Sequence, residues 1–228
     1  MPEVRVLLEV RVQHQRDVPG AVEGGADRLL LSTQAGLSPD LAVASAVLRE
    51  SAAPVRVMLR LNDGPTTTGG EFGRLVGLAE EYLALGAEGV AFGFLDPDLE
   101  VDVETSTALA EALPEVPWTF HDVVDLCLEP SRAWRRLRTL PGLDAVLTAG
   151  SPRGLAVGYD DLLALAQSDP AAAALMLPGG GLVPEHVPWL ARAGVRQVHV
   201  GSQVRPGGTD KAYVDAGHVR SWRLLLDS

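Results

Sequence analysis

Eight short apolar runs, each followed by a segment with helical periodicity, constrain the fold of this chain more than any other feature. They recur at intervals of roughly 20 to 35 residues and most are apolar almost throughout, as expected for strands covered on both faces. Strands that alternate with helices indicate βαβ units and a parallel sheet. The runs are residues 5–10, 28–32, 55–60, 89–94, 117–121, 143–148, 174–177 and 197–201.

The number of runs favours a closed barrel over an open sheet. A chain of 228 residues has room for eight strand–helix units. A doubly wound sheet usually has about five or six strands and a glycine-rich turn after the first one. After the first run this sequence continues as EVRVQ at residues 9–13, without such a turn. We predict one α/β domain over residues 1–228, a (β/α)8 barrel of the TIM type.

One short unit repeats at three predicted helix–strand joints. Residues 25–29, 86–90 and 194–198 each begin with glycine and run directly into an apolar stretch. Glycine is favoured just after a helix because it adopts the left-handed backbone conformation without strain. Repeated use of one joint is what a symmetric barrel needs.

Composition restricts the chemistry and the partners. The net charge of −11 argues against nucleic acid as a partner. The one cysteine, Cys127, allows neither an internal disulfide nor a cysteine-rich zinc site. The single lysine, Lys211, lies beyond the last run, so Schiff-base chemistry at a strand end is not expected. No apolar run reaches the roughly 18 residues of a membrane span, and we expect a cytoplasmic protein without a membrane partner.

Polar residues stand at the predicted carboxyl ends of several runs. Barrel enzymes place their chemistry at this end, because the loops that follow the strands meet there. We therefore expect these side chains to converge on one rim. They are Glu9, Ser32, Arg60, His121, Thr148 and His199.

The segment around His121 suggests acid/base chemistry. Asp125 follows four residues later and is placed to orient the imidazole or to hold it charged. Glu9, His121 and Asp125 are the catalytic candidates. Two alternatives remain open: Glu9, Arg60 and His121 form a buried ion network that only fills the barrel, or Glu9, His121 and His199 bind a metal.

Glycines after the last two runs suggest a place for an anion. Gly179 to Gly181 follow the seventh run, and Gly201 with Ser202 follows the eighth. Barrels commonly bind phosphate in these two loops through backbone N–H groups, although glycine is also common in plain turns. We expect a small anionic ligand and name no cofactor. The predicted binding residues are Arg60, Thr148, Gly180, Gly181, His199, Gly201 and Ser202.

These residues belong to a set of motifs by which the sequence resembles the CutC family over nearly its whole length. The resemblance implies a TIM-type barrel that is cytoplasmic and homodimeric, with a link to copper homeostasis and copper binding. The motifs are Leu8-Glu9, Gly25-Ala26-Asp27-Arg28, Gly36-Leu37-Ser38-Pro39, Arg60, Gly70-Glu71-Phe72, Thr119-Phe120-His121 with Asp125, Val146-Leu147-Thr148 and Val198-His199.

The sequence departs from the family pattern where copper would matter most. Relatives can carry cysteines after the first-strand glutamate and at the end of the second strand, where this chain has residues 10–12 and Ser32. Cu(I) prefers thiolate and thioether ligands. We therefore predict a binding barrel for a small anionic molecule with possible acid/base chemistry; a non-catalytic copper-binding protein and an interaction scaffold are the alternatives.

Overall fold

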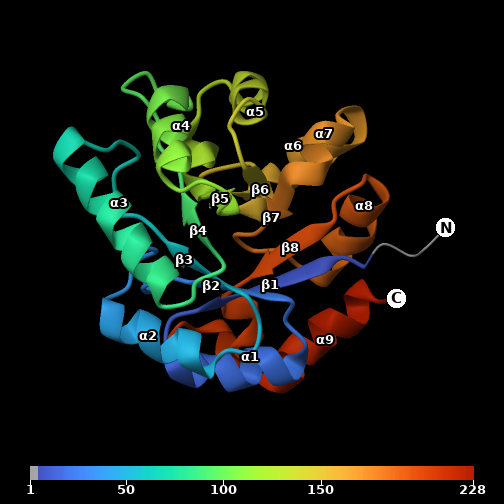
Figure 1. The fold of residues 1–228 in the computed structure, drawn as a ribbon. Coiled ribbons are helices and arrows are strands. Elements are labelled where there is room, and N and C mark those ends of the chain that lie inside the picture. Colours follow the sequence, from blue (N-terminus) through green and yellow to red (C-terminus); the bar gives the residue numbers. More distant parts are fainter. Residues whose placement is uncertain (1–4) are drawn as a thin grey trace.

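The computed structural model describes residues 5–228 and contains an eight-stranded parallel barrel (Figure 1). The strands lie in the order β7-β6-β5-β4-β3-β2-β1-β8, so the first and last strands along the chain are neighbours. The predicted (β/α)8 fold is therefore confirmed. The strands are β1 (Leu7–Val12), β2 (Arg28–Leu31), β3 (Val55–Met58), β4 (Gly89–Phe92), β5 (Trp118–Phe120), β6 (Leu143–Thr148), β7 (Met176–Pro178) and β8 (Gln197–Val200).

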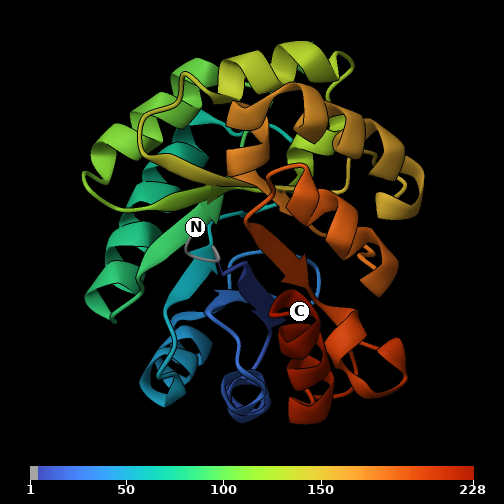
Figure 2. The same ribbon diagram turned by 90° about the vertical axis from the view of Figure 1, so that its right-hand side faces the viewer.

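Helices surround the barrel, as the two perpendicular views show (Figures 1 and 2). The α-helices are α1 (Val18–Gly24), α2 (Leu41–Glu50), α3 (Gly69–Ala84), α4 (Val103–Ala112), α5 (Pro130–Leu137), α6 (Leu155–Ser168), α7 (Pro170–Leu175), α8 (Val187–Arg192) and α9 (Ala216–Leu226). Short 3-10 helices occupy several connections: η1 (Gln15–Asp17), η2 (Asp122–Leu126), η3 (Pro184–His186), η4 (Ser202–Val204) and η5 (Pro206–Gly208). None of the helices in the described part of the chain is long and apolar enough to cross a membrane.

Outward-facing strand residues form the main core against the helices. Phe92 on β4 stacks on Trp118 of β5 with ring centroids 4.0 Å apart, and both are buried. Apolar burial of this kind is the main stabilising contribution to a barrel. Inside the barrel a smaller apolar cluster fills the middle: Leu30, Met58, Ala91, Ala145, Leu147 and Leu177.

The interior towards the amino ends of the strands is polar. Arg56, 1% exposed, donates from its guanidinium to the carboxylates of Glu88 and Asp144 and to the Thr119 hydroxyl. Arg28 on β2 donates to Glu9 on β1. A buried arginine needs such partners because an unpaired buried charge is strongly destabilising. This network closes the end of the barrel opposite the loops that follow the strands.

The barrel has one seam. Among the described strands, hydrogen-bonded ladders join every neighbouring pair except β7 and β8, which lie side by side. Gln197 on β8 bridges this seam through its side chain, donating to the backbone oxygens of Asp144 (3.1 Å) and Leu175 (3.4 Å). Its own oxygen accepts from Arg28 at 3.3 Å. At this joint, side-chain hydrogen bonds from Gln197 to β6 and to the end of α7 stand where the strand ladder is missing.

The three glycine joints behave alike, as predicted. Gly25, Gly86 and Gly194 have φ of 93°, 103° and 103°. In each joint the glycine and the following residue donate their N–H groups back to the last turn of the helix. This is the usual helix ending in which a left-handed residue reverses the chain.

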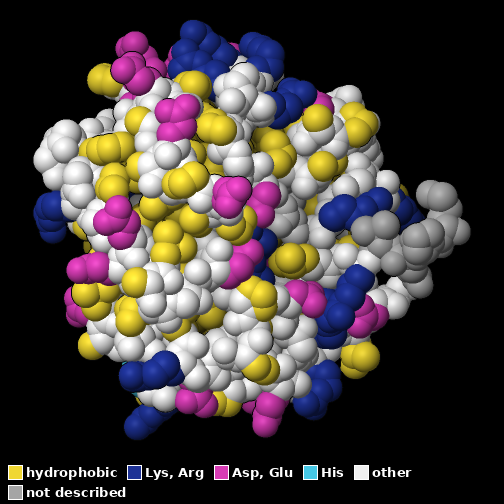
Figure 3. Space-filling view, viewed as in Figure 1, with side chains coloured by type: hydrophobic (Ala, Val, Ile, Leu, Met, Phe, Trp, Pro, Cys, Tyr) yellow, Lys and Arg dark blue, Asp and Glu magenta, His cyan; other side chains and the backbone are white. Residues whose placement is uncertain are grey.

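Charged side chains of both signs are scattered over the face seen in Figure 3, and basic ones gather at its top, over α5. They are largely paired: Arg132 and Arg136 contact Glu100, and Arg138 contacts Asp169. This helix is therefore an ion-paired surface element.

Candidate functional site

A cavity of about 600 Å³ opens at the carboxyl ends of the strands. Eight of the ten predicted site residues line it: Arg60, Asp125, Thr148, Gly180, Gly181, His199, Gly201 and Ser202. They come from the ends of β3, β6, β7 and β8 and from η2, so ring closure brings together residues far apart in the chain. Glu9 and His121, the remaining two, are not among the lining residues.

Glu9 does not end its strand. The sequence predicted a first strand at 5–10, but β1 continues to Val12, so Glu9 lies in its middle and is fully buried. Arg11, two residues on, faces the same side and lines the cavity in its place. The alternation of polar and apolar residues over Leu8 to Val12 could have revealed this, because inward-facing positions recur every second residue.

Glu9 instead holds His199 from beneath. One carboxylate oxygen lies 2.8 Å from Nδ1 of His199 and the other accepts from Nε of Arg28 at 2.5 Å. Burial alone would raise the pKa of Glu9, but Arg28 and the His199 hydrogen bond outweigh it and bring the pKa down to about 2. An ionised carboxylate only accepts, so Nδ1 of His199 carries the proton towards Glu9. The other ring nitrogen, Nε2, is left for a ligand in the cavity.

The buried ion network of Glu9, Arg60 and His121 suggested from the sequence is wrong, because Glu9 is joined to Arg28 and His199 instead. Glu9 pairs with Arg28 at the start of β2, whereas Arg60 lies at the cavity. Sequence reasoning missed both Arg28 and Arg56 as partners. Each arginine faces the barrel interior from an otherwise apolar strand. In the sequence it interrupts the hydrophobic pattern but does not indicate its partner.

His121 and Asp125 do not form the predicted pair. Nδ1 of His121 accepts the backbone N–H of Val123 at 3.1 Å, which caps η2. Burial lowers the pKa of His121 to about 4, so its ring is neutral at pH 7. The pair fails because η2 begins directly after His121 and carries Asp125 towards β6.

Asp125 is bound to the end of β6 instead. Its carboxylate accepts the Thr148 hydroxyl at 2.5 Å and the backbone N–H groups of Ala149 (2.7 Å) and Gly150 (3.0 Å). Burial raises the pKa of Asp125 to about 6, although these hydrogen bonds oppose the rise. A cavity carboxylate with this pKa changes charge close to neutral pH.

Arg60 supplies positive charge to the cavity. Its guanidinium donates to the backbone oxygens of Asn62 (3.1 Å) and Asp63 (2.7 Å), and its backbone N–H donates to Ser38. Within residues 5–228, no carboxylate lies within ion-pair distance of Arg60. Its charge is therefore available to a ligand.

The glycine loops differ in what they leave free. Gly180 and Gly181 line the cavity with φ of 67° and 108°, a conformation that side-chain-bearing residues rarely adopt. The N–H of Gly201 is already used, because it donates to the Gln203 side chain at 2.9 Å. Of the two loops, the one after β7 thus fits the backbone cradle predicted for an anion better.

Fold and cavity together define a (β/α)8 barrel protein with a polar ligand site at the carboxyl end of its strands. The model of the CutC family matches residues 6–204, and the chain belongs to this family.

Relatives match over most of the chain. The family protein CutC of Citrobacter koseri is 31% identical over 198 residues, covering 85% of this chain and 78% of that protein. The family protein CutC of Xanthomonas campestris pv. campestris is 30% identical over 239 aligned residues, covering 97% and 99%. A crystal structure from Streptococcus agalactiae, described as a copper homeostasis protein CutC, superposes with a TM-score of 0.75 at 21% identity and covers 86% of this chain and 98% of that one.

The cavity does not fit copper. Of its lining residues only Met58 contains sulfur, whereas Cu(I) prefers several thiolate or thioether ligands. Cys127 is half-buried outside it, and burial raises its pKa to about 11, which keeps the thiol protonated. In residues 5–228 no three His, Cys, Asp or Glu side chains are placed to hold one metal ion, so Glu9, His121 and His199 do not form the alternative metal site.

Proposed function

We propose that the cavity binds a small molecule that carries an anionic group, and that His199 exchanges a proton with it. The observation that carries the proposal is the Glu9–His199 pair, buried beneath a 600 Å³ cavity with one ring nitrogen committed and the other free. Arg60 and the loop after β7 supply the positive charge and the N–H groups for the anion.

The acid/base part of the proposal rests on the hydrogen bond between Glu9 and His199 and on the pKa of Asp125. Glu9 orients His199 and stabilises the charge that the ring gains with a proton, while Asp125 lies in the cavity wall at the end of β6 with a pKa of about 6. His121 uses its side chain to cap η2, with Nδ1 accepting the Val123 backbone N–H, and is not proposed as a proton-transfer group.

A role in copper homeostasis is suggested for this chain only by the description of a relative. Since the described donor atoms do not fit copper, we propose that any link to copper runs through the anionic ligand and not through a metal held in the cavity. A cytoplasmic location and a homodimer remain proposals from the family resemblance.

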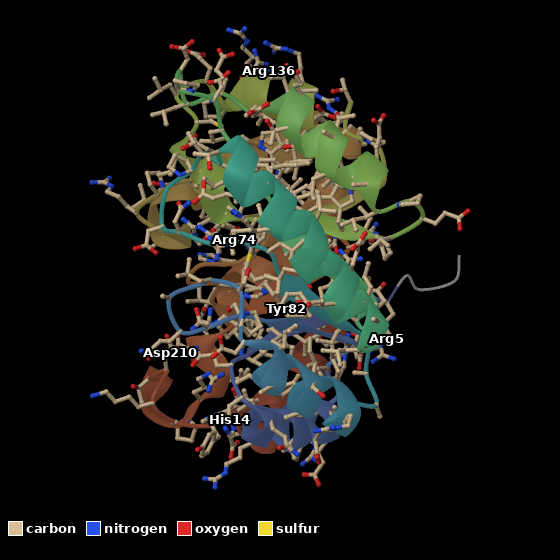
Figure 4. The ribbon with its side chains drawn as sticks, turned by 60° about the vertical axis from the view of Figure 1, so that its left-hand side comes forward. Arg5, His14, Arg74, Tyr82, Arg136 and Asp210 are labelled. Atoms are coloured by element: carbon tan, nitrogen blue, oxygen red, sulfur yellow. The ribbon has the colours of Figure 1, made fainter. Side chains whose placement is uncertain are left out.

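Binding of simple anions tests the proposal. Sulfate, inorganic phosphate and small carboxylates are titrated by calorimetry and thermal unfolding into the wild type, Arg60→Gln and Arg74→Gln. Arg74 is an exposed arginine on α3 outside the cavity and serves as the matched control (Figure 4). We expect at least one anion to stabilise the wild type by about 2.7 kcal/mol at a hundred times its dissociation constant. Arg60→Gln should lose most of this gain and Arg74→Gln should keep it; no binding by the wild type contradicts the proposal.

A further inference from the structure

The segment between β8 and α9 closes one side of the cavity with a carboxylate. Asp210 lines the cavity and forms an ion pair with Arg11 from the end of β1. Figure 4 shows Asp210 at the end of the barrel opposite Arg5, which precedes β1. Both partners are partly buried, with side chains 22% and 25% exposed. A charged group of the protein thus occupies a place where a ligand could bind.

Two arginine N–H groups near Asp210 do not donate a hydrogen bond to its carboxylate. The Nε atoms of Arg11 and Arg205 are buried and have no hydrogen-bond partner within residues 5–228. Nε of Arg205 lies 3.9 Å from the same Asp210 oxygen, too far for a hydrogen bond. The other Arg205 nitrogens are bound to Asp17, to Ala212 and to the Arg11 backbone. A buried donor without a partner is destabilising, so the hydrogen bonding around Asp210 is incomplete.

We propose that Arg11 is the centre of a binding subsite for a phosphoryl group and that Asp210 occupies this subsite as an internal anion until the ligand displaces it. The inference rests on the proposed function and adds Arg11, on the β1–β8 side of the cavity, to Arg60 and the loop after β7 as a group that binds the anion.

Arg11 reaches the cavity beside Gly201, and its side chain is 22% exposed. A Cβ atom on Gly201 would stand 3.4 Å from Nε of Arg11, so the glycine adds no side chain to this side of the guanidinium. Ser202, the residue after Gly201, also lines the cavity. One of the two carboxylate oxygens of Asp210 contacts Arg11, whereas the three terminal oxygens of a phosphoryl group can accept from several donors at once. The subsite therefore suits a tetrahedral oxyanion better than a carboxylate.

His199 lies within the same part of the wall. It is two residues before Gly201 on the strand that carries this subsite, and it pairs with Glu9 of the strand that carries Arg11. A phosphoryl group on Arg11 would place the rest of an esterified ligand over the middle of the cavity. The subsite and the proton-exchanging histidine would then act on one molecule.

Removal of the internal anion tests the inference. Inorganic phosphate and a simple monoester, glycerol 3-phosphate, are titrated by calorimetry into the wild type, Asp210→Asn, Arg11→Gln and Asp122→Asn. Asp122 is the matched control, since it also lines the cavity but makes no ion pair with Arg11. We expect Asp210→Asn to bind phosphate at least about fivefold more tightly, because the competing ion pair is lost. Arg11→Gln should abolish binding, and Asp122→Asn should change affinity by less than about twofold.

The outcomes separate this inference from the proposed function. Equal affinity of the wild type and Asp210→Asn, or an equal gain in Asp122→Asn, overturns the role of Asp210 while anion binding stands. Absence of binding in all four proteins removes the proposed function as well. Tighter binding of the monoester than of phosphate supports an esterified ligand, and the reverse supports free phosphate. In either case the phosphoryl group is assigned to Arg11 only if Arg11→Gln no longer binds the ligand.

Discussion

Asp125 combines burial with a place in the cavity wall. Its three hydrogen bonds from Thr148, Ala149 and Gly150 fix the carboxylate, while burial and the nearby charge of Asp122 raise its pKa to about 6. The group is largely neutral at pH 5 and negative at pH 7. An anion in the cavity is therefore repelled more strongly as the pH rises.

We predict that the affinity for sulfate falls about three- to tenfold between pH 5 and pH 7. Sulfate is chosen because it does not titrate in this range. Asp125→Asn should weaken the pH dependence, and Asp122→Asn should shift the step to lower pH without removing it, because Asp122 only adds to the rise in pKa. Calorimetric titrations across pH measure all three; an unchanged step in Asp125→Asn would assign it to another group.

Particular residues also show where sequence reasoning stopped. The type and approximate position of Arg60, Thr148 and His199 followed from the rule that barrel chemistry lies at strand ends. Their partners did not follow, because a hydrogen bond depends on the side-chain layer in which each residue lies. A shift of two residues in the end of β1 exchanged Glu9 for Arg11 at the cavity.

At the scale of elements, one buried carboxylate holds the segment between β8 and α9 against the end of β1. Asp17 ends η1 and is fully buried. It accepts the backbone N–H groups of Gln13 (2.8 Å) and Val214 (3.0 Å) and two bonds from Arg205 (3.0 and 2.9 Å). The segment that carries Asp210 is therefore anchored on both sides of it.

We predict that Asp17→Ala lowers the free energy of unfolding by about 3–5 kcal/mol, because it leaves the Arg205 charge buried without a carboxylate. Urea unfolding measures the change. Asp98→Ala, in an exposed turn after β4, removes the same group and should cost no more than about 0.5 kcal/mol. Similar losses in the two variants would contradict the anchoring role of Asp17.

For the whole molecule, the eight-strand count and the three glycine joints could be predicted because both arise from local periodicity and backbone preference. The polar network that fills one end of the barrel could not. Arg56 reaches Asp144, 88 residues further along the chain, across the barrel interior. Only the closed ring brings these two residues together.

Gln197 carries the clearest whole-molecule prediction. Gln197→Ala removes the side-chain bridges across the β7–β8 seam and should lower the free energy of unfolding by about 1–3 kcal/mol. Amide hydrogens of β7 and β8 should exchange faster while those of β3 and β4 change less. Gln15→Ala, which removes an exposed bond to Glu50, is the control. Uniform acceleration in all strands would contradict a local seam.

Because the β7–β8 seam lacks a strand ladder among the described strands, a ligand in the cavity should affect its stability. Gly180 and Gly181 follow β7, Gly201 and Ser202 follow β8, and all four line the cavity. A ligand that contacts both loops would link β7 and β8 where no backbone hydrogen bonds join them. We expect the ligand-free protein to open first at the β7–β8 seam, so that the fraction of protein with bound ligand determines its resistance to proteolysis.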